Sequence, residues 1–190
     1  MANGKYAQFT EESNALDYLE KTIEFIRRAE KNPTDWKWVI LSLHGTLYGF
    51  MICALKGTDP DRVRKRERLI SFGEALKRCQ DPGHMIMTTQ SRVLRLSQGQ
   101  QRSLDFIQKH FRNAFEHYEP CLWSIELHGL PEIVMDGLDV SRFLSLEAGN
   151  YTHLTAEQCS HVETLVAQGN EFLRGGQLFR EAQLPAEQRK

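Results

Sequence analysis

The stretch Trp36–Leu55, WKWVILSLHGTLYGFMICAL, decides the fold, because it is apolar on nearly every side of a helix and approaches the length of a membrane span. Its apolar run is broken at six positions: Lys37, Ser42, His44, Gly45, Thr46 and Gly49. A membrane span and the central helix of a bundle are both compatible with such a stretch, and the interruptions favour the bundle. The two glycines, four residues apart, would let a neighbouring helix pack close to its backbone.

Four further helices are predicted around this one from apolar spacing and capping signals. The first carries the stripe Leu16, Leu19, Ile23 and Ile26, and Thr34 or Asp35 is expected to cap the central helix. The four lie at about 10–31, 62–80, 97–119 and 155–173. The stretch 121–136 predicts a short β-hairpin, and 177–190 a flexible tail. The expected fold is therefore an all-α, antiparallel bundle of about five helices, one domain over 1–190 with its core in 10–175.

Composition narrows the class of protein. The chain has 190 residues, 41% of them apolar, which is enough for a single domain with a real core. A net charge of −1 argues against a protein that coats nucleic acid, although it allows one that grips a few phosphates. The four cysteines, at positions 53, 79, 121 and 159, show no CxxC spacing. We therefore expect free thiols in a reducing cytoplasm. No membrane association, no bound metal and no cofactor are expected.

The segment His110–Pro120, HFRNAFEHYEP, closes the predicted helix at 97–119 and carries the candidate site. On a helical wheel its apolar residues face the core, and Arg112, Asn113, Glu116 and His117 face away from it. Arg102 and Lys109 join this outward face at helical spacing, and His110 lies on roughly the same side. The weaker, substrate-binding candidates on this face are Arg102, Lys109, His110 and Glu116.

Arg112 and His117 suit the cleavage of an RNA phosphodiester without a metal. A histidine titrates near neutral pH and can move a proton, while an arginine matches a phosphate with paired donors. Asn113, four residues before His117, can orient the imidazole. Because one histidine is few for concerted acid–base catalysis, a homodimer that pairs two copies of this helix is part of the hypothesis. A solvated face on which Glu116 pairs with Arg112 explains the same residues and stays open.

The hexapeptide Arg112–His117, RNAFEH, resembles the Arg-polar-x-x-x-His motif of the HEPN superfamily, and the helical architecture agrees over about 10–175. The resemblance implies a metal-independent endoribonuclease that acts as a dimer, in toxin–antitoxin or phage-defence systems, with Arg112 and His117 as its catalytic pair. It also implies RNA as substrate and an antitoxin protein as a candidate partner. Glu119 stands where toxins with a nucleotidyltransferase antitoxin often carry a tyrosine, which argues against that kind of antitoxin.

Two alternatives remain beside the nuclease. Some HEPN members are non-catalytic, so the same face would then bind RNA, a nucleotide or a protein. A purely structural interaction protein is the other. The basic run Arg62–Arg68, RVRKRER, predicts either contact with RNA phosphates or a solvated helix start.

Overall fold

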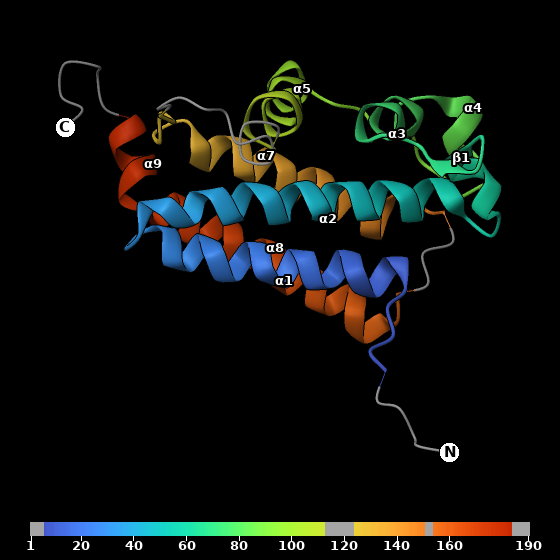
Figure 1. Ribbon diagram of the computed structural model, residues 1–190, viewed down its shortest axis with the longest axis horizontal. Coiled ribbons are helices and arrows are strands. Elements are labelled where there is room, and N and C mark those ends of the chain that lie inside the picture. The colour runs from blue at the N-terminus through green and yellow to red at the C-terminus, as the bar shows by residue number, and fades with distance from the viewer. Residues whose placement is uncertain (1–5, 113–123, 151–153, 184–190) are drawn as a thin grey trace.

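Four long helices form the body of the described protein. The computed structural model describes residues 6–112, 124–150 and 154–183, with the backbone alone at 110–112. The four helices are α1 (Glu11–Ala29), α2 (Trp36–Lys56), α7 (Leu130–Arg142) and α8 (Ala156–Gly175). Both α1 and α7 pack against α2 and α8, so the four close a bundle around one apolar core (Figure 1). The expected mostly helical fold is confirmed.

The helix α2 is the centre of this bundle, as its composition predicts. Leu43, Leu47 and Met51 are fully buried on it. Gly49 lies against Ala15 of α1 so closely that a Cβ atom would stand 2.7 Å from the Ala15 Cβ. At Gly45 a Cβ would stand 2.6 Å from the Tyr18 ring. The two glycines therefore admit the neighbouring helix, as their spacing predicts.

Within the described residues one helical stretch, Pro33–Lys56, is long and apolar enough to cross a membrane by length and composition alone. Its most apolar window has a mean hydropathy of 1.6, and 67% of that window is buried inside the protein. The burial gives the apolar surface a place in the bundle core, which is the role that its all-round apolar character predicts.

Local capping explains where several helices begin. Thr10 caps α1 in a reciprocal box with Ser13, and Thr155 caps α8 with Gln158 as predicted. Of the two residues expected to cap α2, Asp35 stands at the N-cap position. Asp35 precedes α2 at the end of the short helix η1 (Pro33–Asp35), but its carboxylate makes no capping bond. It accepts instead from Arg28 Nε at 3.0 Å, which ties the end of α1 to the start of α2.

The predicted third helix at 62–80 is wrong in its first half. The segment forms η2 (Pro60–Val63), strands β1 (Arg64–Lys65) and β2 (Arg68–Leu69), and α3 (Phe72–Cys79). The antiparallel strands turn at Arg66 and Glu67, which have φ angles of 49° and 61°. Such angles at both central residues suit the right-handed twist of a two-residue hairpin turn. Ser71, whose hydroxyl accepts from the Glu74 N–H, then starts α3.

The hairpin predicted at 121–136 is also wrong where the structure describes it. Residues 121–123 lie outside the described part, and α7 occupies the segment from Leu130 on. Pro131 sits in the first turn of α7, where the missing N–H costs nothing. Leu130, Val134 and Leu138, four residues apart, are fully buried and form its core stripe. The helix continues as the π-helical segment η4 (Phe143–Glu147).

The tail predicted at 177–190 is helical in its first part. The helix α9 (Gln177–Ala182) follows α8 directly and lies at the end of the bundle where α1 passes into α2 (Figure 1). Leu178 packs against the core from it. This apolar contact holds the start of the segment against the bundle.

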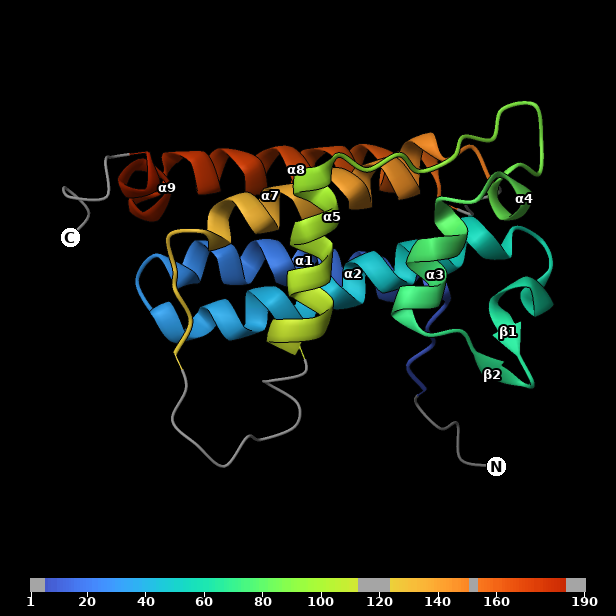
Figure 2. The same ribbon diagram turned by 90° about the horizontal axis from the view of Figure 1, so that it is seen from above.

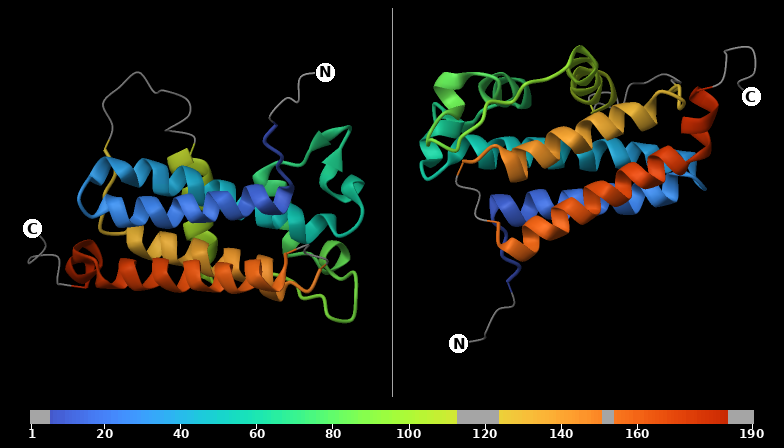
Figure 3. Two further views of the ribbon diagram at one scale, coloured as in Figure 1. Left: turned by 90° about the horizontal axis from the view of Figure 1, so that it is seen from below. Right: turned by 180° about the vertical axis from the view of Figure 1, so that it is seen from behind.

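The expected antiparallel packing holds only within the two pairs α1/α2 and α7/α8. Figure 3 shows α2 and α7 running in the same direction, so the chain must cross back along the bundle between them. The crossover carries the small hairpin, α3, α4 (Pro82–Met85) and α5 (Gln98–Asp105). Helices α3 and α5 lie across α2 at a steep angle, side by side on one face of the bundle (Figure 2).

Candidate functional site

The helix that leads into the Arg112–His117 motif is anchored at its start and in its middle. Ser97 and Gln100 form the predicted capping box at the start of α5. Leu104 and Ile107 are fully buried, and the Ser103 hydroxyl donates to Asp136 of α7 at 2.6 Å. Beyond Asp105 the helix continues as the π-helical segment η3 (Phe106–Arg112). Such wider turns often occur at functional sites.

Most of the predicted catalytic set lies outside the described residues. Asn113, Glu116 and His117 fall in 113–123, and Arg112 and His110 are described by their backbone only. The backbone puts Arg112 at the end of η3.

The two described members of the predicted face are both exposed. Arg102 lies on α5, and Lys109 on η3 pairs with Asp105 at 3.2 Å. Phe106, four residues after Arg102 and three before Lys109, is 43% exposed. Phe106 was not among the predicted site residues, although its place between Leu104 and Ile107 turns it away from the core. An exposed aromatic ring beside basic side chains is the kind of surface on which nucleobases stack.

A polar groove runs beside this face, between α3 and α5, with a volume of about 420 Å³. Gly73 forms part of its floor, and a Cβ there would stand 3.2 Å from the Gln108 side-chain nitrogen. Lys77, Gln108 and Lys109 are among its lining residues. Amide and ammonium groups of this kind can hydrogen-bond to phosphates and base edges.

A second charged feature is the basic hairpin, defined as Arg64–Leu69. Four of its side chains are basic and all four are exposed: Arg64, Lys65, Arg66 and Arg68. Among the described residues none of the four has an ion pair or hydrogen-bond partner. The hairpin therefore presents four basic side chains and one acidic side chain, Glu67, within six residues, which gives it a net charge of +3.

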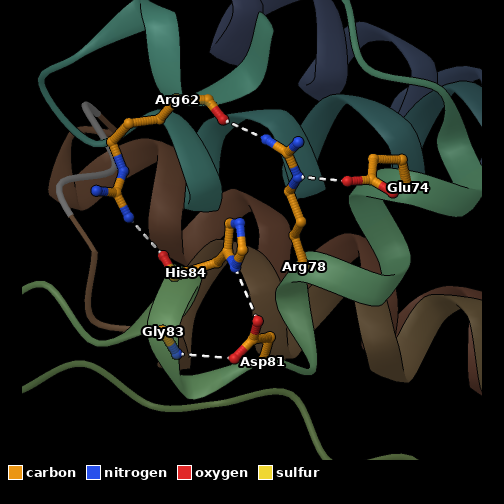
Figure 4. Close-up of polar contacts among 6 residues, drawn as sticks. All are labelled: Arg62, Glu74, Arg78, Asp81, Gly83 and His84. Carbon is orange, nitrogen blue, oxygen red and sulfur yellow. Dashed lines mark hydrogen bonds and ion pairs between the residues drawn. The ribbon is translucent and has the colours of Figure 1, made fainter. Parts of the chain in front are cut away.

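Two other arginines hold the base of the basic hairpin in place (Figure 4). Arg62 donates from Nε to the Leu55 carbonyl at 3.1 Å and from Nη2 to the His84 carbonyl at 2.6 Å. Arg78 donates to the Arg62 carbonyl at 2.9 Å and to Glu74 at 2.8 Å. The hydrogen bond from Arg78 holds the pKa of Glu74 below its usual value. Arg62, counted in the predicted basic run, is thus structural.

The described residues offer no cluster of three or more histidine, cysteine, aspartate or glutamate side chains placed to hold a metal ion. The described cysteines 53, 79 and 159 are free thiols. Burial raises the pKa of the Cys53 thiol to about 12 and also raises that of Cys79. These two thiols are therefore inert as nucleophiles near neutral pH.

Comparison with known proteins gives no relative: no protein-family model, no curated protein and no solved structure matches the chain.

Proposed function

We propose that this protein is a metal-independent endoribonuclease that resembles the HEPN class, with Arg112 and His117 as its catalytic pair. The observation that carries the proposal is the motif Arg112-Asn113-x-x-x-His117, whose first residue is the last described residue of the helical stretch α5–η3. An all-α fold is compatible with this class. The exposed charged residues on α5 and η3 support a polyanionic substrate.

The chemistry needs no nucleophile from the protein. The 2′-oxygen of the RNA attacks the phosphorus, and the bond from phosphorus to the 5′-oxygen breaks. His117 moves the proton from the 2′-hydroxyl or delivers one to the leaving oxygen, with Asn113 orienting its ring. Arg112 offsets the charge that builds on the phosphate oxygens. The products are a 2′,3′-cyclic phosphate and a 5′-hydroxyl end.

A symmetric dimer completes the proposal. Two copies of the predicted face with Arg112 and His117, related by a two-fold axis, would place two arginines and two histidines in one cleft, which supplies both an acid and a base. Light scattering at micromolar concentration is expected to give the mass of a dimer. A strict monomer would contradict this part of the proposal.

The first test is cleavage of a mixed pool of structured and single-stranded RNA by the purified protein in excess EDTA. We expect fragments with 2′,3′-cyclic phosphate ends, because neither the nucleophile nor the charge stabilisation depends on a metal. Absence of fragments, or fragments that appear only when Mg²⁺ is restored, would contradict the nuclease proposal.

The basic hairpin favours a second candidate, an RNA-binding module without catalysis. Its four exposed basic side chains can neutralise phosphates whether or not the motif is active. This candidate predicts RNA binding with no cleavage in EDTA. The cytoplasmic location expected from the cysteines and the antitoxin partner implied by the resemblance both stay predictions.

In either case, the double substitution Arg64→Glu and Lys65→Glu is expected to weaken RNA binding about tenfold or more at low salt, because each lost phosphate contact also removes a counterion-release term. The slope of log affinity against log salt concentration should become shallower by about 0.7 for each contact with single-stranded RNA. Fluorescence anisotropy with a labelled RNA over a salt series measures both quantities.

The matched control is Lys31→Glu with Arg174→Glu, which makes the same change in net charge at exposed positions near the opposite end of the bundle. Equal loss of affinity in both double variants would show a net-charge effect. Unchanged affinity in the hairpin variant would show that the basic hairpin does not contact the RNA.

A further inference from the structure

A groove of about 580 Å³ runs between α1 and α2 on the side of the bundle that turns away from α7 and α8. Figure 2 shows the bundle as two layers, with the basic hairpin projecting beyond the α1/α2 layer. The α2 residues that line the groove recur every three or four positions, opposite the core residues Leu43 and Leu47. The lining is largely apolar and aromatic and includes Tyr18, Phe25, Trp38, Leu41 and Tyr48. Part of the apolar surface of α2 therefore stays accessible at this groove.

Two exposed rings in the groove offer surfaces on which a flat aromatic group can stack. Tyr18 lies against the backbone of α2 at Gly45 and is 40% exposed. Trp38 stacks on Phe25, with ring centroids 6.0 Å apart, and is 46% exposed. Exposed apolar surface that gathers in one groove commonly marks a binding site, and nucleobases stack on aromatic rings of this kind.

The charges of the groove favour an uncharged ligand part inside it. The acidic and basic residues that line it are Glu11, Asp17 and Lys21, two carboxylates and one ammonium with a formal sum of −1. Lys21 is paired with Glu24 at 2.9 Å, and Glu11 is paired with Lys56 at 3.3 Å. Phosphates would meet no excess of positive charge here, whereas the neutral faces of nucleobases suit the lining.

The basic hairpin gives phosphates a place at one end of the groove. Leu69 of the hairpin lines the groove and also lines a second hollow, of about 610 Å³, beside the hairpin. The charged residues that line this hollow are Lys65, Arg66, Arg68 and Glu74. Glu74 is paired with Arg78 at 2.8 Å. Three basic side chains thus remain to neutralise phosphates directly beside the aromatic groove.

Cations also accompany the rings at the other end of the groove. Lys37 Nζ lies 5.0 Å from the centroid of the Trp38 ring, and Arg28 Cζ lies 5.0 Å from that of Phe25. A base that stacks on Trp38 would bring its phosphate near Lys37, whose long side chain can reach it. The groove therefore has basic side chains near both ends and uncharged rings between them.

Single-stranded RNA matches this arrangement, because its bases are unpaired and free to stack while its phosphates lie along one strand. A duplex hides the faces of its bases, and an apolar protein helix would leave the net charge of the basic hairpin unmatched. We propose that the groove between α1 and α2 binds the bases of a single strand of RNA whose phosphates lie along the basic hairpin. The inference rests on RNA binding, which both candidates of the proposed function share, and it does not use the Arg112–His117 motif.

The test compares two labelled strands of equal length and charge, one with bases and one with abasic riboses. Both strands carry 2′-O-methyl groups, so that no 2′-hydroxyl is present and neither strand can be cleaved by its own 2′-oxygen. Fluorescence anisotropy at low salt measures the affinity of the wild-type protein for each strand. The strand with bases is expected to bind at least about fivefold more tightly, which is the contribution of one stacked base at the low end of its usual range.

The variant Trp38→Ala locates the bases in the groove. It is expected to weaken binding of the strand with bases about fivefold or more and to leave binding of the abasic strand unchanged. The matched control is Phe172→Ala on α8 in the other layer, which removes a ring that is 45% exposed and should change neither affinity. If Trp38→Ala does not fold, the comparison of the two strands on the wild-type protein still decides.

The outcomes separate this inference from the proposed function. Equal affinity of the wild-type protein for the two strands, or an equal loss of both affinities in Trp38→Ala, would overturn base binding in the groove while RNA binding by the basic hairpin stands. Binding of neither strand would overturn the inference together with the RNA binding on which it rests. Absence of cleavage in EDTA, with the preference for the strand with bases intact, would contradict the nuclease alone.

Discussion

His117→Ala is expected to lower the rate of RNA cleavage in EDTA by roughly 100- to 10,000-fold, the usual contribution of a positioned general acid or base. RNA affinity should change little, because the imidazole acts on a proton and the phosphates are held by arginine and lysine side chains. Single-turnover cleavage of an end-labelled RNA, with binding measured separately on a non-cleavable 2′-deoxy analogue, separates the two effects.

The matched control is His161→Ala. His161 lies exposed on α8, where its Nε2 is 2.9 Å from a Glu20 oxygen, so its loss should leave cleavage unchanged. Arg112→Ala should reduce the rate by a comparable factor, since it removes charge stabilisation in the transition state. Cleavage by His117→Ala at the wild-type rate would point to a contaminating nuclease or another site. The motif would then be interpreted as a solvated helix face.

The helices that the sequence predicts well have strong local signals. The capping boxes at Ser97 and Thr155 each satisfy helix N–H groups within four residues, so no distant contact can easily overrule them. The apolar helix α2 has only one stable place, because its all-round apolar surface requires cover on every side. These features need no knowledge of the rest of the fold.

The basic hairpin escaped prediction because the two buried residues that flank it, Val63 and Ile70, fit two structures equally. Val63 and Ile70 are seven residues apart, which places them on one face of a helix. The same spacing places them opposite each other across a hairpin, where the Ile70 N–H donates to the Val63 carbonyl at 2.9 Å. The bonds of Arg62 and Arg78 at the base favour the hairpin, and they come from residues that no local pattern joins.

The candidate sites also differ in how far local sequence patterns predict them. The motif Arg112–His117 is a local pattern, and its role as a site stays a prediction, because 113–117 lie outside the described residues. An apolar pocket lined by Trp36, Leu173 and Leu178 depends on α9 folding back from the far end of the chain, and local periodicity carries no signal for such a contact. Pro131 concealed the start of α7, because a proline reads as a breaker unless it is placed in the first turn.

One such distant contact fixes the opposite end of the bundle. Asn150 is only 2% exposed, and its side-chain amide donates to the Ala54 carbonyl at 2.8 Å and to the Met85 carbonyl at 3.0 Å. Its oxygen accepts from the Ser91 hydroxyl at 2.5 Å. The preceding Gly149 has a φ of +68° and lies so near the Gln90 carbonyl that a Cβ would stand 2.2 Å from it. A single amide thus joins the end of α2, the end of α4 and the loop that leads to α5.

Asn150→Asp is therefore expected to destabilise the protein by about 3–5 kcal/mol at pH 7, because it turns a buried double donor into a charge that faces two carbonyl oxygens. Burial and those oxygens should raise the pKa of the introduced carboxyl in the folded state above its unfolded value of about 3.9. A group whose pKa is higher in the folded state than in the unfolded state makes the protein less stable as the pH rises through that range. The stability lost through Asn150→Asp should therefore shrink as the pH falls toward 4. Urea unfolding at pH 7 and pH 4.5 measures both effects. The control is Asn14→Asp at an exposed position of α1, whose free energy of unfolding should stay within about 0.5 kcal/mol of wild type. A deficit below about 1 kcal/mol at pH 7, or one that grows at low pH, would mean that Asn150 does not hold these segments together.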